Sequence, residues 1–571
     1  MTLISSRAST LLTLLIPLLF LSTLTMMMLN KTLLVEFELL SPNPAPMKLL
    51  IILDPWGLLF ATTVIFISAN VLKFSSSYMQ GDPFLNRFII LVLLFVMSMI
   101  LLIFIPHMIS LLLGWDGLGL TSFCLVIYYQ NPKSLAAGMI TALTNRVGDV
   151  LILIVIALLL NQGHWTILNS WASHSSQLIT LFILMAAMTK SAQVPFSSWL
   201  PAAMAAPTPV SALVHSSTLV TAGIFLLIRF YPYLSTTAWF CPTTLILASL
   251  TMLMAGVSAT AETDLKKIIA LSTLSQLGVM MMSLGLGLQA LTLFHLLTHA
   301  MFKALLFLTA GNIIHSHLHN QDLRTVGNLV SQMPLTLACM LTANIALTGL
   351  PFLSGFYSKD MILEFSMHWP FSVSVIFIAM TATVLTSVYS MRFMASVTWA
   401  PPHQPPMHQI QDEDANISLP MLTLSVGAIM SGSTLNWAFL TPHVHPALPD
   451  SMKLLPLIMT LSGLSFAWAI NTFYTTKTSD ASQAPMIHWH TTTMWFLAPL
   501  STQAMLKLPY RAAEAMTTTL DQGWWEKTTS KGAFTTLQTC GHMFQHWSLA
   551  PMTTLLLTAS TLFIPIFIFL Q

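Results

Sequence analysis

Long apolar runs recur along the whole chain, and most have the length of a helix that crosses a membrane. Such a helix needs about 20 residues that are mainly apolar. No run shows the regular alternation of a transmembrane barrel strand, so the pattern predicts helices throughout. We expect about fifteen spans, near residues 10–30, 50–72, 85–105, 107–129, 135–160, 178–200, 208–231, 242–260, 266–286, 288–312, 334–353, 356–396, 419–440, 454–474 and 550–570.

Two polar stretches interrupt this pattern late in the chain, at residues 401–416 and 484–548. In the second stretch apolar residues recur every four positions, which puts an apolar stripe on one side of a helix. That stripe consists of Leu508, Ala512, Met516, Leu520 and Trp524. A helix of this kind lies along a membrane surface, and residues 508–546 would span roughly 55–60 Å. A shorter helix followed by a loop is the alternative, because Gly532 or Gly541 can interrupt it.

The composition narrows the class of protein. Hydrophobic residues make up 55% of the 571 residues and charged residues 7%, whereas soluble domains carry roughly 25% charged residues. The chain is therefore predicted to be an all-α polytopic membrane protein. Its net charge of +2 argues against a nucleic-acid partner. Its four cysteines are far apart and form no C-x-x-C motif, so we expect neither an iron–sulfur cluster nor a structural metal.

Isolated charged residues stand inside several of the apolar stretches. Lys190, for example, is the one charged residue between Asp149 and Arg229. A charge at the centre of a bilayer costs roughly 2.5–3.5 kcal/mol. Acids and bases that are kept there mark routes for ions or protons. The isolated charges are Asp116, Lys190, Lys303 and the neighbours Lys359 and Asp360.

Two breaks rich in proline and glycine occur at corresponding places in the chain. Residues 193–201 follow Lys190, and residues 348–355 precede Lys359. Broken membrane helices place binding sites near the middle of the bilayer. We therefore expect two related halves, each with a broken helix. The regions that we predict are N-terminal spans in 1–84, the repeats in 85–232 and 242–396, additional spans in 417–475, the amphipathic surface helix in 484–548 and an anchor span in 550–571.

The first half contains candidate proton carriers. For Asp116 the alternative is a carboxylate that caps a helix at the membrane interface. Lys190 can exchange a proton with a neighbouring acid, although a lysine at a span end can also extend to the interface. Arg146 and Asp149 lie three residues apart on one helix face and form a structural ion pair, or Asp149 serves as a movable partner for Asp116 or Lys190. His215 stands alone in an apolar span, where a hydrogen-bonded core histidine is an equally good interpretation.

The second half carries the most specific local pattern. His295, His299 and Lys303 are spaced by four residues and therefore share one helix face over roughly 12 Å. The motif lacks the glutamate of H-E-x-x-H, and no carboxylate stands nearby as a further metal ligand. We interpret the row as stepping stones for protons, with a metal-binding pair of histidines as the alternative. Lys359 would end the row, unless Ser358 or Asp360 only caps a helix.

Together these segments resemble the antiporter-like chain 5 family of mitochondrial respiratory complex I, an NADH:ubiquinone oxidoreductase. The resemblance covers residues 50–396 and continues with a surface helix. Aspartate stands at position 116 where the family often has glutamate, and we find one span fewer than the family commonly has. The 37 methionines also fit an animal mitochondrial genetic code. The matching segments are Gly114–Gly119, Asn145–Asp149, Thr189–Pro201, Pro207–Thr218, Asp264–Gly278, His295–Lys303 and Gly349–Asp360.

The resemblance implies a membrane-arm subunit that translocates protons across the mitochondrial inner membrane, with its two halves as inverted repeats. Electron transfer from NADH to ubiquinone then takes place in other subunits, which hold the FMN, the iron–sulfur clusters and the ubiquinone. The implied partners are neighbouring antiporter-like subunits along the surface helix, accessory subunits and membrane lipids.

The resemblance also assigns roles to the candidate residues. We expect coupling to begin at an Asp116–Lys190 pair and to end at Lys359, with no cofactor or metal bound by this chain. The alternatives are a subunit of a multisubunit cation/proton antiporter and a scaffold whose buried charges are structural. The relay residues are Asp116, Lys190, His215, His295, His299, Lys303 and Lys359, and the residues of supporting ion pairs are Arg146, Asp149 and Asp360.

Overall fold

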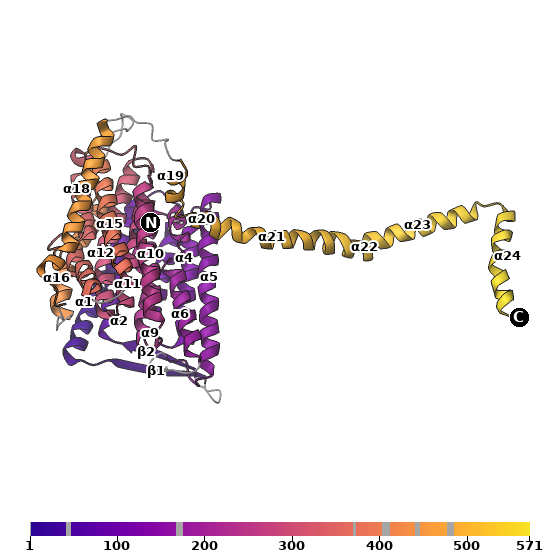
Figure 1. Cartoon of the computed structure of the whole chain (residues 1–571), viewed down its shortest axis with the longest axis horizontal. Helices are drawn as coiled ribbons and strands as arrows, with labels where there is room; N and C mark the ends of the chain where they lie inside the picture. Colours follow the sequence, from indigo (N-terminus) through magenta and orange to yellow (C-terminus); the bar gives the residue numbers. More distant parts are fainter. Residues whose placement is uncertain are drawn as a thin grey trace. The chain divides into compact units, whose positions relative to one another are not determined.

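The computed structural model describes residues 2–40, 47–166, 175–368, 373–401, 412–439, 446–476 and 485–570 of the chain. These residues form two compact units, Met1–Ala498 and Pro499–Gln571. Figure 1 shows the chain coloured along its sequence. The helices up to the unit boundary are α1 (Thr2–Leu29), α2 (Pro55–Tyr78), α3 (Leu85–Phe104), α4 (Met108–Val126), α5 (Pro132–Leu160), α6 (Ser176–Lys190), α7 (Trp199–Ala202), η2 (Ala203–Ala205), α8 (Thr208–Val210), η3 (Ser211–Thr218), α9 (Leu219–Leu234), α10 (Phe240–Ala261), α11 (Leu265–Gly285), α12 (Gln289–Ser316), η4 (Leu329–Ser331), α13 (Pro334–Thr348), η5 (Phe356–Asp360), α14 (Met361–His368), α15 (Val373–Thr398), α16 (Ala415–Phe439), α17 (Asp450–Lys453), α18 (Leu455–Thr476), α19 (Pro485–Thr492) and α20 (Leu497–Pro499).

The first unit consists mainly of helices that run side by side (Figure 1). Within the described parts of the whole chain, twelve helices are long and apolar enough to cross a membrane. Three shorter apolar helices accompany them, α6, α13 and the first part of α18. The predicted helical, polytopic architecture is confirmed, whereas the exact number of spans stays a prediction.

Three long helices form the buried centre of the first unit. The continuous helix α8–η3–α9 and helix α11 are buried along a membrane-length window, and α12 is buried along most of one. α12 packs against both α11 and η3. The candidate histidines lie on α12 and η3. The helices packed around these two elements therefore shield the histidine side chains from lipid.

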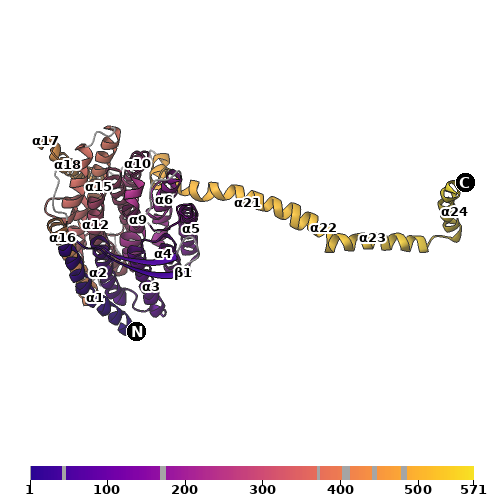
Figure 2. The same ribbon diagram turned by 90° about the horizontal axis from the view of Figure 1, so that it is seen from below.

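A β-hairpin lies between the first two spans, and its second strand includes residues 50–53, which were predicted as the start of the second span. β1 (Leu33–Leu40) pairs antiparallel with β2 (Met47–Leu53), and the hairpin lies across one end of the helices (Figures 1 and 2). Glu36 alternates with apolar neighbours, which favours a strand, and it accepts a hydrogen bond from Lys48 at 3.0 Å. The second span begins only at Pro55, since proline suits the first turn of a helix.

Two of the predicted spans are broken in the structure. α6 ends at Lys190 instead of reaching residue 200, because proline residues in the following segment cannot continue a helix. The segment predicted as one span at 356–396 consists of η5 with α14 and then α15, and residues 369–372 between them lie outside the described residues. η3 and η5 are π-helical, a conformation frequent at functional sites.

The second unit is a row of amphipathic helices followed by one apolar helix. Its elements are η6 (Leu500–Ala504), α21 (Met505–Met516), η7 (Thr517–Trp525), α22 (Glu526–Thr528), α23 (Ser530–Ser548) and α24 (Met552–Phe569). The predicted surface helix is thus interrupted at Thr529, where the backbone leaves the helical conformation. Leu508, Met516 and Trp524 of its apolar stripe are exposed in this chain. α24 matches the predicted anchor span in length and composition.

Candidate functional site

Lys190 ends α6 and is fully buried beside Trp115 of α4. Its amine donates a hydrogen bond to the backbone carbonyl oxygen of Trp115 at 2.6 Å and lies 3.8 Å from the centre of the indole ring. The indole N–H donates in turn to a carboxylate oxygen of Asp149 on α5 at 2.8 Å. Trp115 therefore connects a buried amine to a buried carboxylate through two short contacts.

Asp116 and Arg146 form the outer end of this group. The Arg146 guanidinium lies 3.3 Å from Asp149 and 3.8 Å from Asp116. The side chains of Arg146 and Asp116 stay 54% and 37% exposed, although each lies near the middle of a membrane-length helix. Asp116 and Lys190 make no ion pair within 4.0 Å in the described residues. Contacts through Arg146, Asp149 and Trp115 connect them, and their part in coupling stays a prediction.

Two contacts at Thr189, near the end of α6, bring the first break and α5 against this helix. Trp199 donates its indole N–H to the backbone carbonyl oxygen of Thr189 at 3.0 Å. Gly148 lets α5 approach the same residue, since a Cβ at this glycine would lie 2.3 Å from the Thr189 hydroxyl. Small residues are used in this way where membrane helices pack closely. Both contacts act next to Lys190 and fix its position.

His215 lies on η3, past the break, and is buried. Its ring centre is 6.2 Å from that of Trp199. Neither ring nitrogen has a hydrogen-bond partner among the described residues. The interpretation of His215 as a histidine with its hydrogen bonds satisfied inside the protein core therefore does not hold.

His295 connects α12 to the segment that carries Lys359. Its Nδ1 lies 2.9 Å from the hydroxyl of Ser358 on η5, and its Nε2 lies 3.2 Å from the side-chain oxygen of Gln276 on α11. The Ser358 hydroxyl is also 3.2 Å from that of Thr298. The two ring nitrogens are thus held from opposite sides, which fixes the ring orientation.

His299 and Lys303 continue the same face of α12. The ring centres of His295 and His299 are 6.3 Å apart, and both His299 nitrogens lack a partner within the described ranges. The Lys303 amine is fully buried and donates to the hydroxyl of Ser272 on α11 at 2.5 Å. Of these three residues, His295 is the one with a contact to η5, through Ser358 next to Lys359.

Lys359 lies just beyond the second break and is buried. Its amine donates to the Thr386 hydroxyl at 3.0 Å and to the carbonyl oxygen of Thr348, the last residue of α13, at 3.4 Å. Lys190 is the last residue of α6, and the Lys359 amine reaches the last carbonyl of α13, so both lie at a helix C-terminus, where the helix dipole favours a cation. Gly349 makes the break possible, because its φ of +88° suits only glycine without strain.

Asp360 makes no close ion pair in the described residues, so its supporting role stays a prediction. Within the described residues no basic side chain is found within 4.0 Å of its carboxylate, and one of its oxygens has no hydrogen-bond partner. Adjacent side chains on a helix point about 100° apart, and the Lys359 amine turns away towards Thr386.

Several contact residues were not predicted from the sequence. Ser272 and Gln276 lie four residues apart on α11, so a polar stripe in an otherwise apolar helix was the signal for them. Trp115 and Thr386 gave no such signal, since their roles depend on tertiary contacts. Among the described residues, no group of three or more His, Cys, Asp or Glu side chains is placed to hold a metal ion.

Comparisons with known proteins give the family. Residues 41–89 match the model described as NADH-ubiquinone oxidoreductase (complex I), chain 5 N-terminus. Residues 105–386 match NADH:quinone oxidoreductase/Mrp antiporter, and residues 389–570 match NADH dehydrogenase subunit 5 C-terminus. The chain is 55% identical over 505 residues to NADH-ubiquinone oxidoreductase chain 5 of Lumbricus terrestris, covering 88% of both chains. The chain belongs to the NADH-ubiquinone oxidoreductase chain 5 family.

More distant members and a solved structure complete this comparison. Chain 5 of Mus musculus is 37% identical over 499 residues, covering 86% of this chain and 82% of the mouse chain. The structure of an Mrp complex from Dietzia sp. is similar with a TM-score of 0.74 at 24% identity, covering 96% of this chain and 60% of that chain. At this identity the likeness shows the fold alone.

Membership of the family confirms the resemblance found in the sequence. The protein is a proton-pumping membrane-arm subunit of respiratory complex I, and so a subunit of an NADH-ubiquinone oxidoreductase. Other subunits of complex I are its partners. The antiporter alternative has only the shared fold in its favour.

Proposed function

We propose that protons cross this subunit along one buried row of side chains. The observation that carries the proposal is the contact at 2.9 Å between His295 and Ser358, because it connects three titratable residues of α12 to the segment of Lys359. Arg146, Asp149 and Asp360 act as supporting charges. The proposed order of carriers is Asp116, Lys190, His215, Lys303, His299, His295 and Lys359.

Coupling starts at Asp116 and Arg146 in this proposal. Both side chains are partly exposed in the chain alone and lie mid-span, where contact with lipid would cost roughly 2.5–3.5 kcal/mol per charge. We infer that another subunit covers them. A charge shift there, driven by ubiquinone chemistry in other subunits, would draw Arg146 towards or away from Asp149. Through Trp115, this changes how well the proton on Lys190 is stabilised.

Water is proposed to bridge the gaps in the row. His215 and His299 are buried, and their ring nitrogens are without partners among the described residues. Buried polar groups in proteins are nearly always satisfied by protein or by ordered water. A density map of the intact complex that resolves water should therefore place water within hydrogen-bond distance of both histidines. Dry, apolar surroundings at either histidine would contradict the relay.

The surroundings of the subunit follow from the same proposal. FMN, iron–sulfur clusters and ubiquinone are held by partner subunits in the mitochondrial inner membrane. The amphipathic helices of the second unit run along neighbouring antiporter-like subunits, and accessory subunits and lipids complete the environment. Lys527 and Lys531 should cross-link to other membrane-arm subunits in the intact complex. Cross-links from these lysines to this chain alone would argue against that placement.

A cation/proton antiporter is distinguished by its driving force. The proposal requires that proton movement through the purified complex depend on NADH oxidation. Exchange of sodium for protons in vesicles without NADH would instead support the antiporter alternative.

A further inference from the structure

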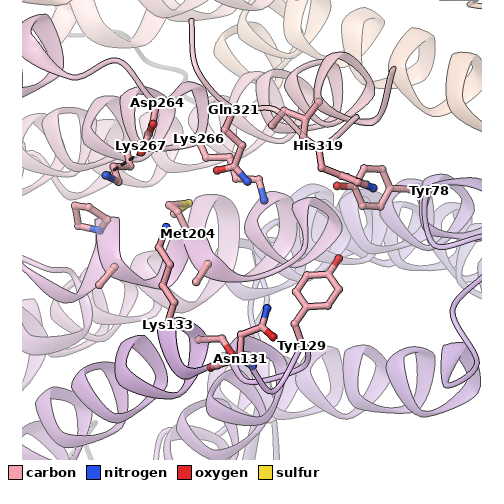
Figure 3. Close-up of a pocket in the computed structure, with 15 residues that line it drawn as sticks. Tyr78, Tyr129, Asn131, Lys133, Met204, Asp264, Lys266, Lys267, His319 and Gln321 are labelled. Atoms are coloured by element: carbon pink, nitrogen blue, oxygen red, sulfur yellow. Dashed lines mark hydrogen bonds and ion pairs between the residues drawn. The ribbon is translucent and has the colours of Figure 1, made fainter. Parts of the chain in front are cut away.

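A cavity of about 450 Å³ opens where several membrane-length helices of the first unit begin or end (Figure 3). Tyr78 is the last residue of α2, Lys133 the second of α5 and Lys266 the second of α11. Residues 201, 202, 204 and 205, at and just after the end of the first break, and residues 319 and 321 after α12 also line it. Since helix ends of this kind lie at the boundary between membrane and water, the cavity lies at the depth of lipid headgroups.

The lining carries an excess of positive charge. Lys267 forms an ion pair with Asp264 at 2.8 Å, which leaves Lys133 and Lys266 without a carboxylate within 4.0 Å among the described residues. Figure 3 shows these two lysines reaching into the space between the helices from opposite sides. Among the residues that the structure describes, no other acidic side chain lines the cavity. The cavity therefore has two cations in excess.

Lys266 is the more informative of the two lysines. Its side chain is buried, with the residue only 4% exposed, and it donates a single hydrogen bond, to the carbonyl oxygen of Ala206 at 3.0 Å. A lysine has three N–H donors. Burying a cation is costly unless an opposite charge compensates it. An anion in the cavity would supply that charge and accept the remaining donors.

Neutral donors surround the two lysines. The hydroxyls of Tyr78 and Tyr129 and the side-chain amides of Asn131 and Gln321 line the same space. Burial raises the pKa of the Tyr129 hydroxyl, so it stays protonated and can donate. The first turns of α5 and α11 add the positive ends of two helix dipoles. This set of cations and neutral donors suits a compact oxyanion with several acceptor oxygens.

We propose that this cavity binds an anionic phosphate group, contacted by Lys133, Lys266 and Tyr129. Phosphate fits because lysine is a general phosphate binder and several donors converge. The headgroup of an acidic phospholipid is the favoured source. Leu135, Met139 and Leu143 are exposed at four-residue spacing along α5, beginning two residues after Lys133. An acyl chain can lie along that stripe while the headgroup occupies the cavity.

The experiment uses intact complex I in phosphatidylcholine nanodiscs that contain a photoactivatable phosphatidylglycerol. Labelling should map to residues 129–143 and to the lining of the cavity. Lys133 is exposed, so Lys133→Gln should leave the fold intact. The variant should lower this labelling about tenfold, because one charged hydrogen bond to the phosphate is lost. Lys31→Gln is the matched control, since Lys31 is also exposed next to the end of a membrane helix, and it should label like the native complex.

Two further arms separate the sources of phosphate. Labelling that persists in the presence of inorganic phosphate assigns the cavity to the lipid headgroup. The cavity is assigned to the free ion if two results are obtained. Radiolabelled inorganic phosphate binds the native complex more tightly than the Lys133→Gln complex, and adding inorganic phosphate abolishes the lipid labelling. Either result supports a phosphate site. Equal labelling of Lys133→Gln and native complexes, or equal labelling by a photoactivatable phosphatidylcholine, would overturn the proposal.

Discussion

The amine of Lys190 contacts Trp115 twice. It donates a hydrogen bond to the backbone carbonyl oxygen of Trp115, and it lies over the face of the indole ring. The ring and the carbonyl hold the amine in a buried position that no carboxylate reaches directly, while the indole N–H holds Asp149. A single tryptophan thus fixes the distance between a base and an acid of the proposed row. Changing this residue tests whether that spacing matters for pumping.

Trp115→Phe keeps an aromatic ring under Lys190 and removes only the donor to Asp149. The buried carboxylate then loses a hydrogen bond, at a cost of about 1–3 kcal/mol. We expect the complex to assemble and the number of protons pumped per NADH to fall. Proton uptake and NADH oxidation measured together in vesicles give this ratio. Trp165→Phe is the control, because Trp165 donates to the carbonyl oxygen of Ile156 outside the row and its loss should leave the ratio unchanged.

Ser358→Ala removes the hydroxyl between His295 and the Lys359 segment. Without it, proton transfer across this contact should slow by about tenfold, the effect of roughly 1.4 kcal/mol on a barrier. Single-turnover proton release after a pulse of NADH measures this step. Ser366→Ala is a matched change, since Ser366 is also buried and bonds only to the carbonyl oxygen of Leu363. If both variants release protons at the same rate, Ser358 has no part in the relay.

Gly349→Ala places a Cβ on a backbone with positive φ, at a cost of about 1–2 kcal/mol. The new Cβ would also lie 3.3 Å from a carboxylate oxygen of Asp360. We expect a shifted second break and weaker pumping, read from the same proton-to-NADH ratio. Gly163→Ala carries similar strain, since Gly163 has φ of +76° with open space around it. This control should lower thermal stability and preserve pumping.

Arg229 makes a bidentate pair with Asp54, at 2.6 and 2.7 Å, and joins α9 to the start of α2. The two side chains are only 22% and 12% exposed, so breaking the pair should cost about 1–3 kcal/mol. Arg229→Gln should lower the temperature at which the complex unfolds and leave the proton-to-NADH ratio unchanged. Adding Asp54→Asn to Arg229→Gln should lower the unfolding temperature little further, because Asp54 has already lost its partner. Full additivity of the two losses would show that the pair does not stabilise the unit.

Much of the candidate site was predictable because isolated charges in apolar spans are costly and few. Lys190, Lys303 and Lys359 stood out for this reason, and the four-residue spacing of His295 and His299 placed them on one face. The structure keeps that face and adds a contact that the spacing did not indicate, between His295 and Ser358, the neighbour of Lys359, while the order of the carriers stays a prediction. Sequence spacing gives a shared face, but only packing against η5 decides which end meets the next carrier.

The remaining errors have local physical causes. The hairpin of β1 and β2 was missed because its strands are as apolar as a span, and only the alternation of Glu36 and Glu38 marks β1 as a strand. The surroundings of Lys190 could not be predicted either, because they depend on tertiary contacts. Its amine donates a hydrogen bond to the backbone carbonyl of Trp115 and lies over the indole ring, while Arg146 lies 3.8 Å from Asp116.

The central claim is that Lys190 carries protons, and Lys190→Met tests it most directly. Methionine has a similar length and suits an apolar site, so the complex should assemble with its subunits intact. Lys31→Met serves as the control, since it removes an exposed lysine outside the row. We expect the number of protons pumped per NADH to fall in Lys190→Met and not in Lys31→Met. An unchanged ratio in a fully assembled Lys190→Met complex would contradict the claim.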